Sequence, residues 1–314
     1  MSKWIDKNLF DKYVENKEKE QENTNKTFIK RTENVWQTPA AGTATQPEIY
    51  EGRFLPDPEN VFTSKYYYHM WKSGDKWHFA FCQKTWDFNN YCPVCSVTNK
   101  LYMGTSKDKS LAGNMKRKVR HVSNFYIVSD PRDSRISEPE KKATGKNKIY
   151  EFPDKVDAKI KLQLLDKNEG LGSDIFDPGD DGHNFILRIK STKPDANGKT
   201  YPDYSDSDFS RKSSAIGTDK QIKDIMEKRY NLNTYIKSLE TSKEQIVEIL
   251  KSEMLYELVK DELQKTSLPE EKEVKEVNVK KVDNETPVDK KEELDVPDSI
   301  GDDDDLLREL ENMK

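Results

Sequence analysis

The chain has 314 residues, enough for one large domain or two small domains with tails. Apolar residues make up 33% of it and charged residues 35%, so we expect a compact core with long solvated segments. No run of about 20 apolar residues is present, which excludes a membrane-spanning helix. The first 20 residues lack the apolar stretch of a signal peptide, and three cysteines do not describe a disulfide framework. The composition predicts a cytoplasmic protein.

The net charge of −5 is unevenly distributed along the chain. Residues 270–314 include 17 acidic and 8 basic residues, whereas the rest of the chain has a net charge of +4. We expect residues 266–314 to form an acidic, disordered tail that binds other proteins, with a merely solubilising role as the alternative. The predicted partner-binding residues share the acidic and leucine-rich end of this tail: Asp302, Asp303, Asp304, Asp305, Leu306 and Leu307.

Residues 1–47 are expected to form an N-terminal segment outside the main fold. Trp4, Phe10 and Tyr13 recur at helical spacing and predict one short amphipathic helix. Residues 38–48 are rich in Ala, Thr, Gly and Pro, which is typical of a flexible linker.

Residues 49–215 contain most of the aromatic residues, in short β-prone runs separated by turn residues. The clearest strands lie at Asn124–Val128, Lys148–Phe152 and Asn184–Lys190, and the last of them alternates like a half-buried strand. Apolar positions between residues 219 and 264 fit two helices that follow this antiparallel β body. The predicted fold class is therefore mainly β with C-terminal helices.

One motif is specific enough to predict a metal site. His69, Cys82, Cys92 and Cys95 follow the spacing H-x12-C-x9-C-x2-C, and the Cys-Pro-Val-Cys turn directs two thiolates to one point. Three thiolates and one imidazole form a closed set for one structural Zn²⁺, with no open position for water. His78 is a rival nitrogen ligand, because on a strand it would share a face with Cys82.

Motifs of several enzyme classes are missing, so we predict that the protein is not an enzyme. Zinc deaminases need H-x-E and P-C-x-x-C, but Met-Trp follows His69, and Tyr91 stands where the proline should be. The sequence Gly198-Lys199-Thr200 lacks the first glycine of a phosphate-binding loop. A nuclease would need a carboxylate cluster, and the one local candidate set reads as a turn: Asp177, Asp180 and Asp181.

A basic run beside aromatic residues indicates nucleic-acid binding. Four cations lead into a predicted strand: Lys116, Arg117, Lys118 and Arg120. On this strand Lys116, Lys118 and Arg120 would form a row on one face. Cations that hold the backbone and rings that stack on bases are the features of a single-strand site. The candidate rings are those of Tyr91, Tyr102, Tyr201 and Tyr204. The alternative is that most of these rings belong to the core.

The sequence resembles the single-stranded DNA-binding proteins of T4-type bacteriophages over roughly residues 48–260 and the last dozen residues. Arg53-Phe54-Leu55-Pro56 and the complete Cys/His spacing carry the resemblance, together with further matches along the chain. These matches are Leu101-Tyr102, Lys116-Arg117-Lys118, Asn124, Val128, Asp130-Pro131, Phe185–Lys190, Tyr204, Phe209, Ser214-Ala215-Ile216 and the Asp-rich end with Leu306-Leu307.

The resemblance implies an OB-like β-barrel core at residues 48–265 with an inserted zinc subdomain at about residues 64–115. It also implies that the histidine ligand is His69. The side chains that it places toward DNA are those of Lys116, Arg117, Lys118, Tyr102, Tyr201 and Tyr204. Implied partners are single-stranded DNA in an infected host cell and, through the tail, replication and recombination proteins.

Two departures from the family pattern affect what the resemblance implies. His121-Val122 stands where the family has a Tyr-Trp pair, so one stacking or packing contact is missing or moved. The family's basic element for cooperative self-association lies at the extreme N-terminus, whereas the nearest equivalent here is Lys30-Arg31-Thr32. Cooperative self-association on DNA is thus left open.

The sequence as a whole predicts sequence-independent binding and protection of single-stranded DNA during phage DNA replication, recombination and repair. The acidic tail is expected to compete with DNA for a basic, aromatic-lined cleft, since the tail and the cleft carry opposite charge. A zinc-stabilised protein–protein adaptor and a single-strand RNA-binding regulator are the alternatives.

Overall fold

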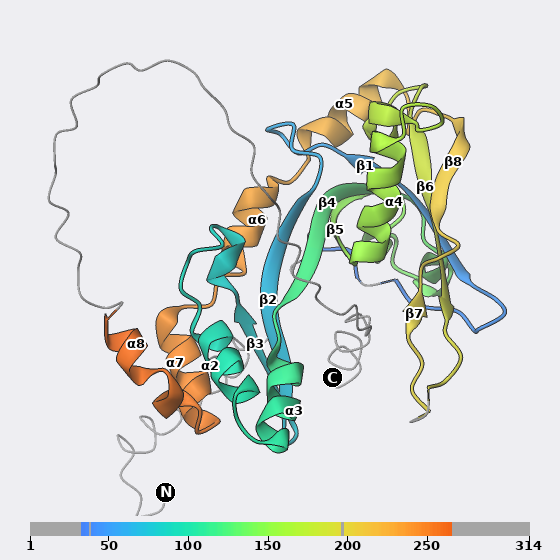
Figure 1. Cartoon of the computed structure of the whole chain (residues 1–314). Coiled ribbons are helices and arrows are strands. Elements are labelled where there is room, and N and C mark those ends of the chain that lie inside the picture. The colour runs from blue at the N-terminus through green and yellow to red at the C-terminus, as the bar shows by residue number, and fades with distance from the viewer. Residues whose placement is uncertain (1–32, 38, 196–197, 266–314) are drawn as a thin grey trace, which may run out of the picture.

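The computed structural model describes residues 33–37, 39–195 and 198–265 (Figure 1). The helix predicted around Trp4, Phe10 and Tyr13 and the predicted acidic tail lie outside these residues. None of the helices in the described ranges has the length and apolar character needed to cross a bilayer. The described chain is mainly antiparallel sheet with helices near its C-terminal end, so the predicted fold class is confirmed.

One antiparallel sheet organises the molecule, with the strand order β3-β2-β4-β1-β6-β7. β5 is added beside β4, and β8 is added beside β6. The strands are β1 (Glu48–Leu55), β2 (Ser64–Ser73), β3 (Lys76–Phe81), β4 (Lys118–Ser129), β5 (Asn147–Phe152), β6 (His183–Ser191), β7 (Pro202–Asp203) and β8 (Asp208–Ser213). The three strands expected from the sequence fall within β4, β5 and β6 and are confirmed.

The long strand β4 joins two halves of the sheet. Its residues 118–122 pair with β2, and its residues 124–129 pair with β1. Gly52 lies at a bulge in β1, where a Cβ atom would come within 2.3 Å of the ring of Phe125. Only glycine permits this close approach, and the bulge increases the local twist of the strand pair.

The half of the sheet that contains β1, β5, β6 and β8 encloses a core of aromatic rings. Phe54 is fully buried there, and its ring centroid lies 4.9 Å from that of Phe125 and 5.4 Å from that of Phe185. The helix α4 (Asp154–Leu165) and the 3-10 helix Gly172–Phe176 contribute further buried side chains to this core. β5 and β8 are the two ends of this curved, OB-like arrangement.

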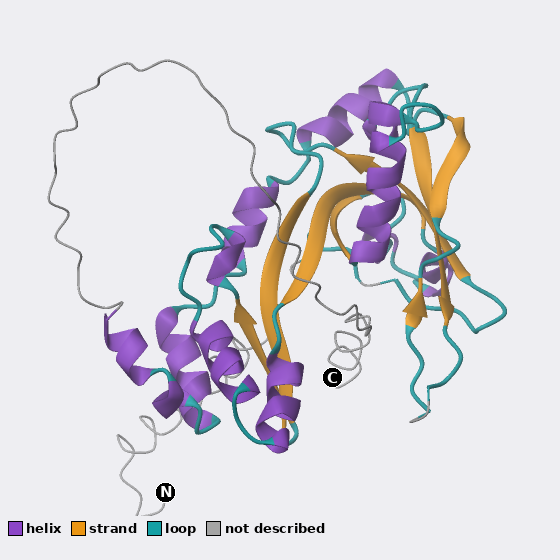
Figure 2. Cartoon of the chain, in the orientation of Figure 1, coloured by secondary structure: helices purple, strands orange, loops and turns teal. Residues whose placement is uncertain are grey.

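A second lobe is built on β2 and β3 and is covered by helices from two parts of the chain (Figure 2). α2 (Pro93–Tyr102) and α3 (Ser106–Met115) follow the strands, and α7 (Lys243–Ser252) and α8 (Lys260–Lys265) return from the end of the described chain. Apolar side chains from all four helices pack in one buried cluster: Val94, Ala112, Ile249 and Leu263 are examples. We call residues 64–115 and 243–265 together the cysteine lobe.

The expectation of two helices between residues 219 and 264 is wrong, because this stretch forms four α-helices. They are α5 (Asp219–Glu227), α6 (Leu232–Ser238), α7 and α8, with a 3-10 helix at Tyr256–Leu258 before α8. Asn231 and Ser242 each start a new helix by accepting a hydrogen bond from the backbone N–H three residues later. These caps divide the apolar stretch into shorter pieces.

The predicted linker also differs from expectation, because its described part packs against the ring core. The backbone N–H of Ala40 donates to the hydroxyl of Tyr50 over 2.9 Å, and that of Gly42 donates to the carbonyl of Ile189 over 2.9 Å. Trp36, just before this segment, is 3% exposed within the ring core. The packed core therefore begins before residue 48.

Candidate metal centre and nucleic-acid surface

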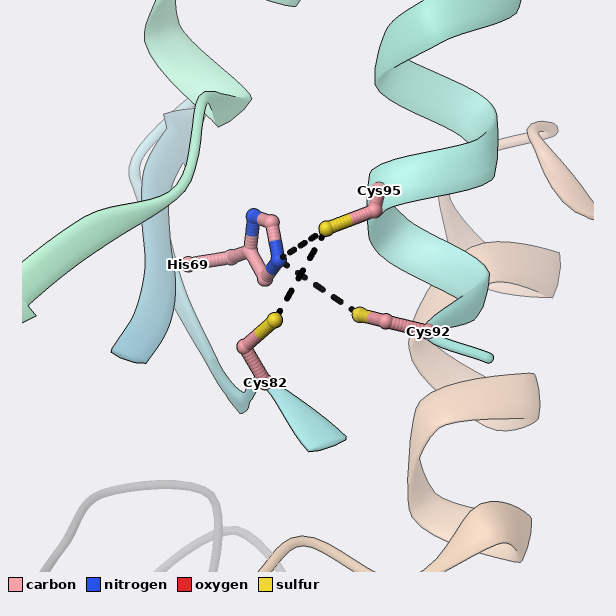
Figure 3. Close-up of side chains that lie close together, drawn as sticks. All are labelled: His69, Cys82, Cys92 and Cys95. Atoms are coloured by element: carbon pink, nitrogen blue, oxygen red, sulfur yellow. Dashed lines mark hydrogen bonds between the residues drawn. The ribbon is translucent and has the colours of Figure 1, made fainter. Parts of the chain in front are cut away.

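The four predicted metal ligands converge in the cysteine lobe (Figure 3). His69 projects from β2, Cys82 follows β3, Cys92 caps the N-terminus of α2, and Cys95 lies in the first turn of that helix. Pro93 occupies the first turn too, where its missing N–H costs no hydrogen bond. The ligand atoms lie within 4.8 Å of one another. The sequence motif therefore becomes one compact donor set.

The separations within this set fit one tetrahedral metal ion. Bonds of about 2.3 Å to sulfur and about 2.0 Å to nitrogen would place two sulfurs about 3.8 Å apart, and a sulfur about 3.6 Å from the nitrogen. Cys82 Sγ lies 3.7 Å from Cys95 Sγ, and His69 Nε2 lies 3.5 Å from Cys92 Sγ and 3.4 Å from Cys95 Sγ. All three cysteines are free thiols rather than disulfides. The residues present thus fit a thiolate-binding metal such as zinc.

The orientation of the His69 ring is fixed by the backbone of α3. His69 Nδ1 lies 2.8 Å from the carbonyl oxygen of Met115, which can only accept, so Nδ1 carries the hydrogen. Nε2 is thereby left facing the thiols, as a metal ligand must be. Burial lowers the pKa of His69, but its hydrogen bonds to Cys82 and Cys92 outweigh burial and raise the pKa to about 9.

The thiols of Cys92 and Cys95 differ in how readily they ionise. Hydrogen bonding with Cys82 and Cys95 strongly lowers the pKa of Cys92, whereas hydrogen bonding with Cys82 and Cys92 raises the pKa of Cys95. Without a cation, the first thiol to ionise therefore disfavours ionisation of the next thiol. A bound divalent ion removes this conflict, because it stabilises each thiolate as a ligand.

His78, the rival nitrogen ligand in the sequence, packs against Trp71 and Glu253 in the structure. It is 1% exposed, and its ring stacks on that of Trp71 with a centroid distance of 5.2 Å. Its Nε2 lies 2.8 Å from Glu253 Oε1, at the end of α7. The structure therefore assigns the nitrogen of the donor set to His69, and His78 connects β3 to a C-terminal helix.

The predicted basic run is divided between the surface and the interior. Lys116 ends α3 and is exposed, and Arg117 is partly exposed. Because β4 begins only at Lys118, the expected row of three cations on one strand face is wrong. Lys118 and Arg120 are 8% and 2% exposed, and Arg120 Nη2 lies 3.4 Å from the hydroxyl of Tyr68. These two residues are placed to brace the sheet, and their contact with DNA stays a prediction.

Arg117 lies in a group of cations and rings on the cysteine lobe. The centre of its guanidinium is 4.7 Å from the ring centroid of Tyr67 and 4.8 Å from that of Phe88. Lys84 Nζ lies 4.7 Å from the Phe88 centroid, and Lys65 Nζ lies 5.6 Å from the Tyr67 centroid. Phe88 is 61% exposed. We call these five residues the Arg117 cluster.

Sequence reasoning missed the two lysines of the Arg117 cluster. Lys65 and Tyr67 are two residues apart on β2, so their shared face could have been read from the sequence. Lys84 lies in a 3-10 helix after Cys82, and no periodic pattern marks it.

The four candidate tyrosines do not form one group. Tyr102 ends α2 and is 45% exposed, whereas the hydroxyl of Tyr91 donates to Glu262 Oε2 over 3.1 Å. Tyr201 precedes β7, which lies across Figure 1 from α3, and Lys199 Nζ is 5.3 Å from its ring centroid. Tyr204 is 2% exposed in the ring core, so its stacking on a base stays a prediction that this packing does not favour.

The two residues that depart from the family pattern are both buried. Val122 is fully buried, and His121 is 6% exposed with its ring stacked on that of Phe152. His121 Nε2 lies 2.7 Å from Asp154 Oδ1, and Nδ1 lies 3.3 Å from Asp157 Oδ1. His121 therefore holds α4 against β4, and neither residue offers an exposed ring for stacking.

A comparison with models of protein families matches residues 52–255 to the family described as gp32 DNA binding protein like. The matched range includes the four metal-ligand candidates, the Arg117 cluster and most of the OB-like half. A comparison with curated proteins finds no match to the chain. The family match confirms the resemblance found in the sequence and covers well over half of the 314 residues. The chain belongs to the gp32-like family of DNA-binding proteins.

Proposed function

We propose that the protein binds single-stranded DNA without sequence preference and protects it during phage DNA replication, recombination and repair. Membership of the gp32-like DNA-binding family supports this function. The Arg117 cluster is the observation on the molecule that carries it most directly, because it places two cations, Arg117 and Lys84, against the exposed ring of Phe88. Phosphates would be held by the cations, and bases would stack on the ring faces.

The chemistry of these groups accounts for binding without sequence preference. Every base has a flat face, and stacking on an aromatic side chain contributes about 1–3 kcal/mol per base whatever the base is. Lysine ammonium and arginine guanidinium groups that meet phosphates carry no sequence information. Phe88 and Tyr102 are the most exposed rings on the described chain segments of the cysteine lobe.

The DNA contacts that we propose are Lys116, Arg117, Tyr91, Tyr102 and Tyr201. Lys118, Arg120 and Tyr204 stay predicted contacts, although their burial favours a role in supporting the other five. Since β7 and α3 lie apart in Figure 1, contacts at Arg117 and at Tyr201 would involve separate parts of a bound DNA strand.

One structural zinc ion would be held by His69, Cys82, Cys92 and Cys95. With all four positions occupied by protein, the ion would supply no Lewis-acid chemistry to a substrate and would instead fix the fold of the cysteine lobe. This role agrees with a binding protein that has no enzymatic activity. The donor set and its spacing support the choice of zinc.

The acidic end of the chain, Asp302 to Leu307, would recruit replication and recombination proteins and compete with DNA for the cations. The tail at residues 266–314 and the N-terminal segment at residues 1–47 would flank the DNA-binding core in the cytoplasm of the infected cell. If the N-terminal segment supports self-association along DNA, binding would be cooperative.

Fluorescence titration with oligo-dT, compared with a matched duplex at two salt concentrations, tests this function. We expect single strands alone to change the tryptophan signal, because Trp86 is 42% exposed close to Phe88 in sequence. Affinity should fall as salt rises, and Arg117→Ala should lower the slope of log affinity against log salt by about 0.7, the value for one phosphate on a single strand. Lys167→Ala, an exposed lysine outside the cysteine lobe, is the control.

No response to either nucleic acid would refute the proposal and favour the zinc-stabilised adaptor. A response to oligo-U equal to or stronger than that to oligo-dT would instead favour the RNA-binding regulator. Loss of affinity in the Lys167→Ala control equal to that in Arg117→Ala would show that the cysteine lobe has no special part in binding.

A further inference from the structure

The carboxylate of Glu262, on α8, gathers three donors from residues 91–100, the segment that contains two of the metal-ligand candidates. Oε2 accepts the hydroxyl of Tyr91 over 3.1 Å and the hydroxyl of Ser96 over 2.5 Å, and Oε1 accepts the ammonium of Lys100. These hydrogen bonds lower the pKa of Glu262, with Lys100 the largest cause. Glu262 lies beyond residue 255, where the family match ends.

The donors are adjacent to the cysteine ligands in the chain. Tyr91 immediately precedes Cys92, and Ser96 immediately follows Cys95. One carboxylate therefore fixes both ends of the Cys-Pro-Val-Cys turn from outside. Groups that orient metal ligands in this way commonly change metal affinity by about 10–100-fold when they are removed.

Apolar contacts attach α8 to the same turn. Val259 and Leu263 are 1% and 4% exposed, and they lie in the buried cluster that contains Cys82 and Cys92. Lys100 Nζ also donates to the carbonyl of Leu258 over 2.5 Å, just before α8 begins. Polar and apolar contacts thus hold α8 against the outer side of the metal centre.

We propose that α8 is a latch on the metal centre, and that docking of α8 and binding of metal stabilise each other. Glu262 is the positioning residue. Bound metal fixes the first turn of α2, and this turn presents Tyr91 and Ser96 to Glu262. A docked α8 in turn holds Cys92 and Cys95 in the geometry that metal requires. Because such coupling is reciprocal, metal loss releases α8, and loss of the Glu262 contacts weakens metal binding. The inference rests on the proposed metal site.

Zinc competition with a colorimetric chelator on the full chain tests the coupling. Glu262→Ala should raise the dissociation constant for zinc by about 10-fold, at the lower end of such effects because Glu262 acts through neighbours of the ligands. Glu262→Gln should lie between Glu262→Ala and the wild type, since its amide oxygen can still accept from Tyr91 and Ser96. Glu257→Ala is the matched control, because this exposed residue pairs with Lys260 on the same segment and should leave zinc affinity within twofold.

A second measurement on the wild type tests the latch without a variant that might fail to fold. Hydrogen exchange of peptides covering residues 260–265 should become faster when zinc is removed. Equal zinc affinities for Glu262→Ala and Glu257→Ala, or unchanged exchange of α8 after zinc removal, would overturn the latch. Failure of the wild type to bind zinc at all would overturn the metal site itself and the latch with it, so the two failures are distinguishable.

Discussion

Replacement of Trp36 by alanine tests whether the core begins before the OB-like strands. The indole is 3% exposed and stacks on the ring of Phe125 at a centroid distance of 5.3 Å and an interplanar angle of 21°. It also meets the rings of Tyr50 and Tyr150 edge-on, at 5.7 and 5.1 Å. Its Nε1–H donates to Asp130 Oδ2 over 2.9 Å.

These contacts set the expected cost. Truncation of a buried tryptophan to alanine destabilises proteins by about 3–5 kcal/mol, through lost burial and the cavity that remains. The lost hydrogen bond adds little, because Asp130 keeps the guanidinium of Arg132, with Nη2 at 2.7 Å from Oδ2. We therefore expect Trp36→Ala to lower the free energy of unfolding by about 4 kcal/mol, a large share of the roughly 5–15 kcal/mol of a typical domain. Trp36→Phe keeps a ring and should cost much less.

Urea denaturation followed by far-UV circular dichroism measures this change without depending on tryptophan emission. Trp86→Ala is the control, because Trp86 is 42% exposed and its loss should cost under about 1 kcal/mol. A loss below about 1 kcal/mol for Trp36→Ala would refute the assignment of this segment to the core and restore the flexible-linker interpretation.

Three further predictions concern the metal centre, the buried arginine and an acidic turn. Removal of zinc by a chelator should make Cys82, Cys92 and Cys95 accessible to a thiol reagent, as measured by mass spectrometry, while equal labelling with and without zinc would count against a metal site. Gly182→Ala should lower the free energy of unfolding, measured in urea, by at least about 3 kcal/mol. A Cβ at this position would lie 1.8 Å from Arg53 Nη1 and 1.9 Å from the carbonyl oxygen of Asp177, so it would displace the buried guanidinium from its partners. Burial raises the pKa of Asp133, but hydrogen bonds from Thr144 and Ala143 outweigh burial and lower this pKa below 3.8. The ionised Asp133 therefore contributes its full stabilisation above pH 3.8. This contribution disappears as the pH falls through the lower pKa of the folded state. The difference in free energy of unfolding between the wild type and Asp133→Asn should therefore shrink between pH 6 and pH 3, and a constant difference would contradict the assignment.

The sequence was most informative where the signal is local. Two cysteines within one turn predicted thiolates of the donor set, short β-prone runs predicted the strands within β4 and β5, and alternation predicted the strand within β6. The caps at Asn231 and Ser242 were equally local and could have divided the C-terminal helices correctly. Ser242 even has the Gln three residues later that completes a capping box.

Long-range contacts were beyond the reach of the sequence. No local pattern around Trp36 predicts its contact with Phe125. Likewise, no local pattern around Arg53 predicts its hydrogen bond to Asn184, whose Oδ1 accepts from Arg53 Nε over 3.0 Å. The alternation of β4 placed Lys118 and Arg120 on one face, but it could not say that other parts of the chain cover that face. Which side of a strand is buried depends on packing partners that lie far away in the sequence.

Hydrogen bonds to the backbone connect the metal centre and the proposed DNA surface: Cys82 N–H donates to the carbonyl of Tyr67 over 2.9 Å, and a second bond comes from His69. His69 gives its Nδ1–H to the carbonyl of Met115, a fully buried residue at the end of α3. The next two residues are Lys116 and Arg117, where the backbone leaves the helix and enters β4. A metal ion on Nε2 would fix the imidazole and, through it, the end of α3, two residues before the cation that packs on Tyr67 and Phe88. A structural metal would therefore have a functional consequence, since it would help to set the position of the cation that we expect to meet DNA.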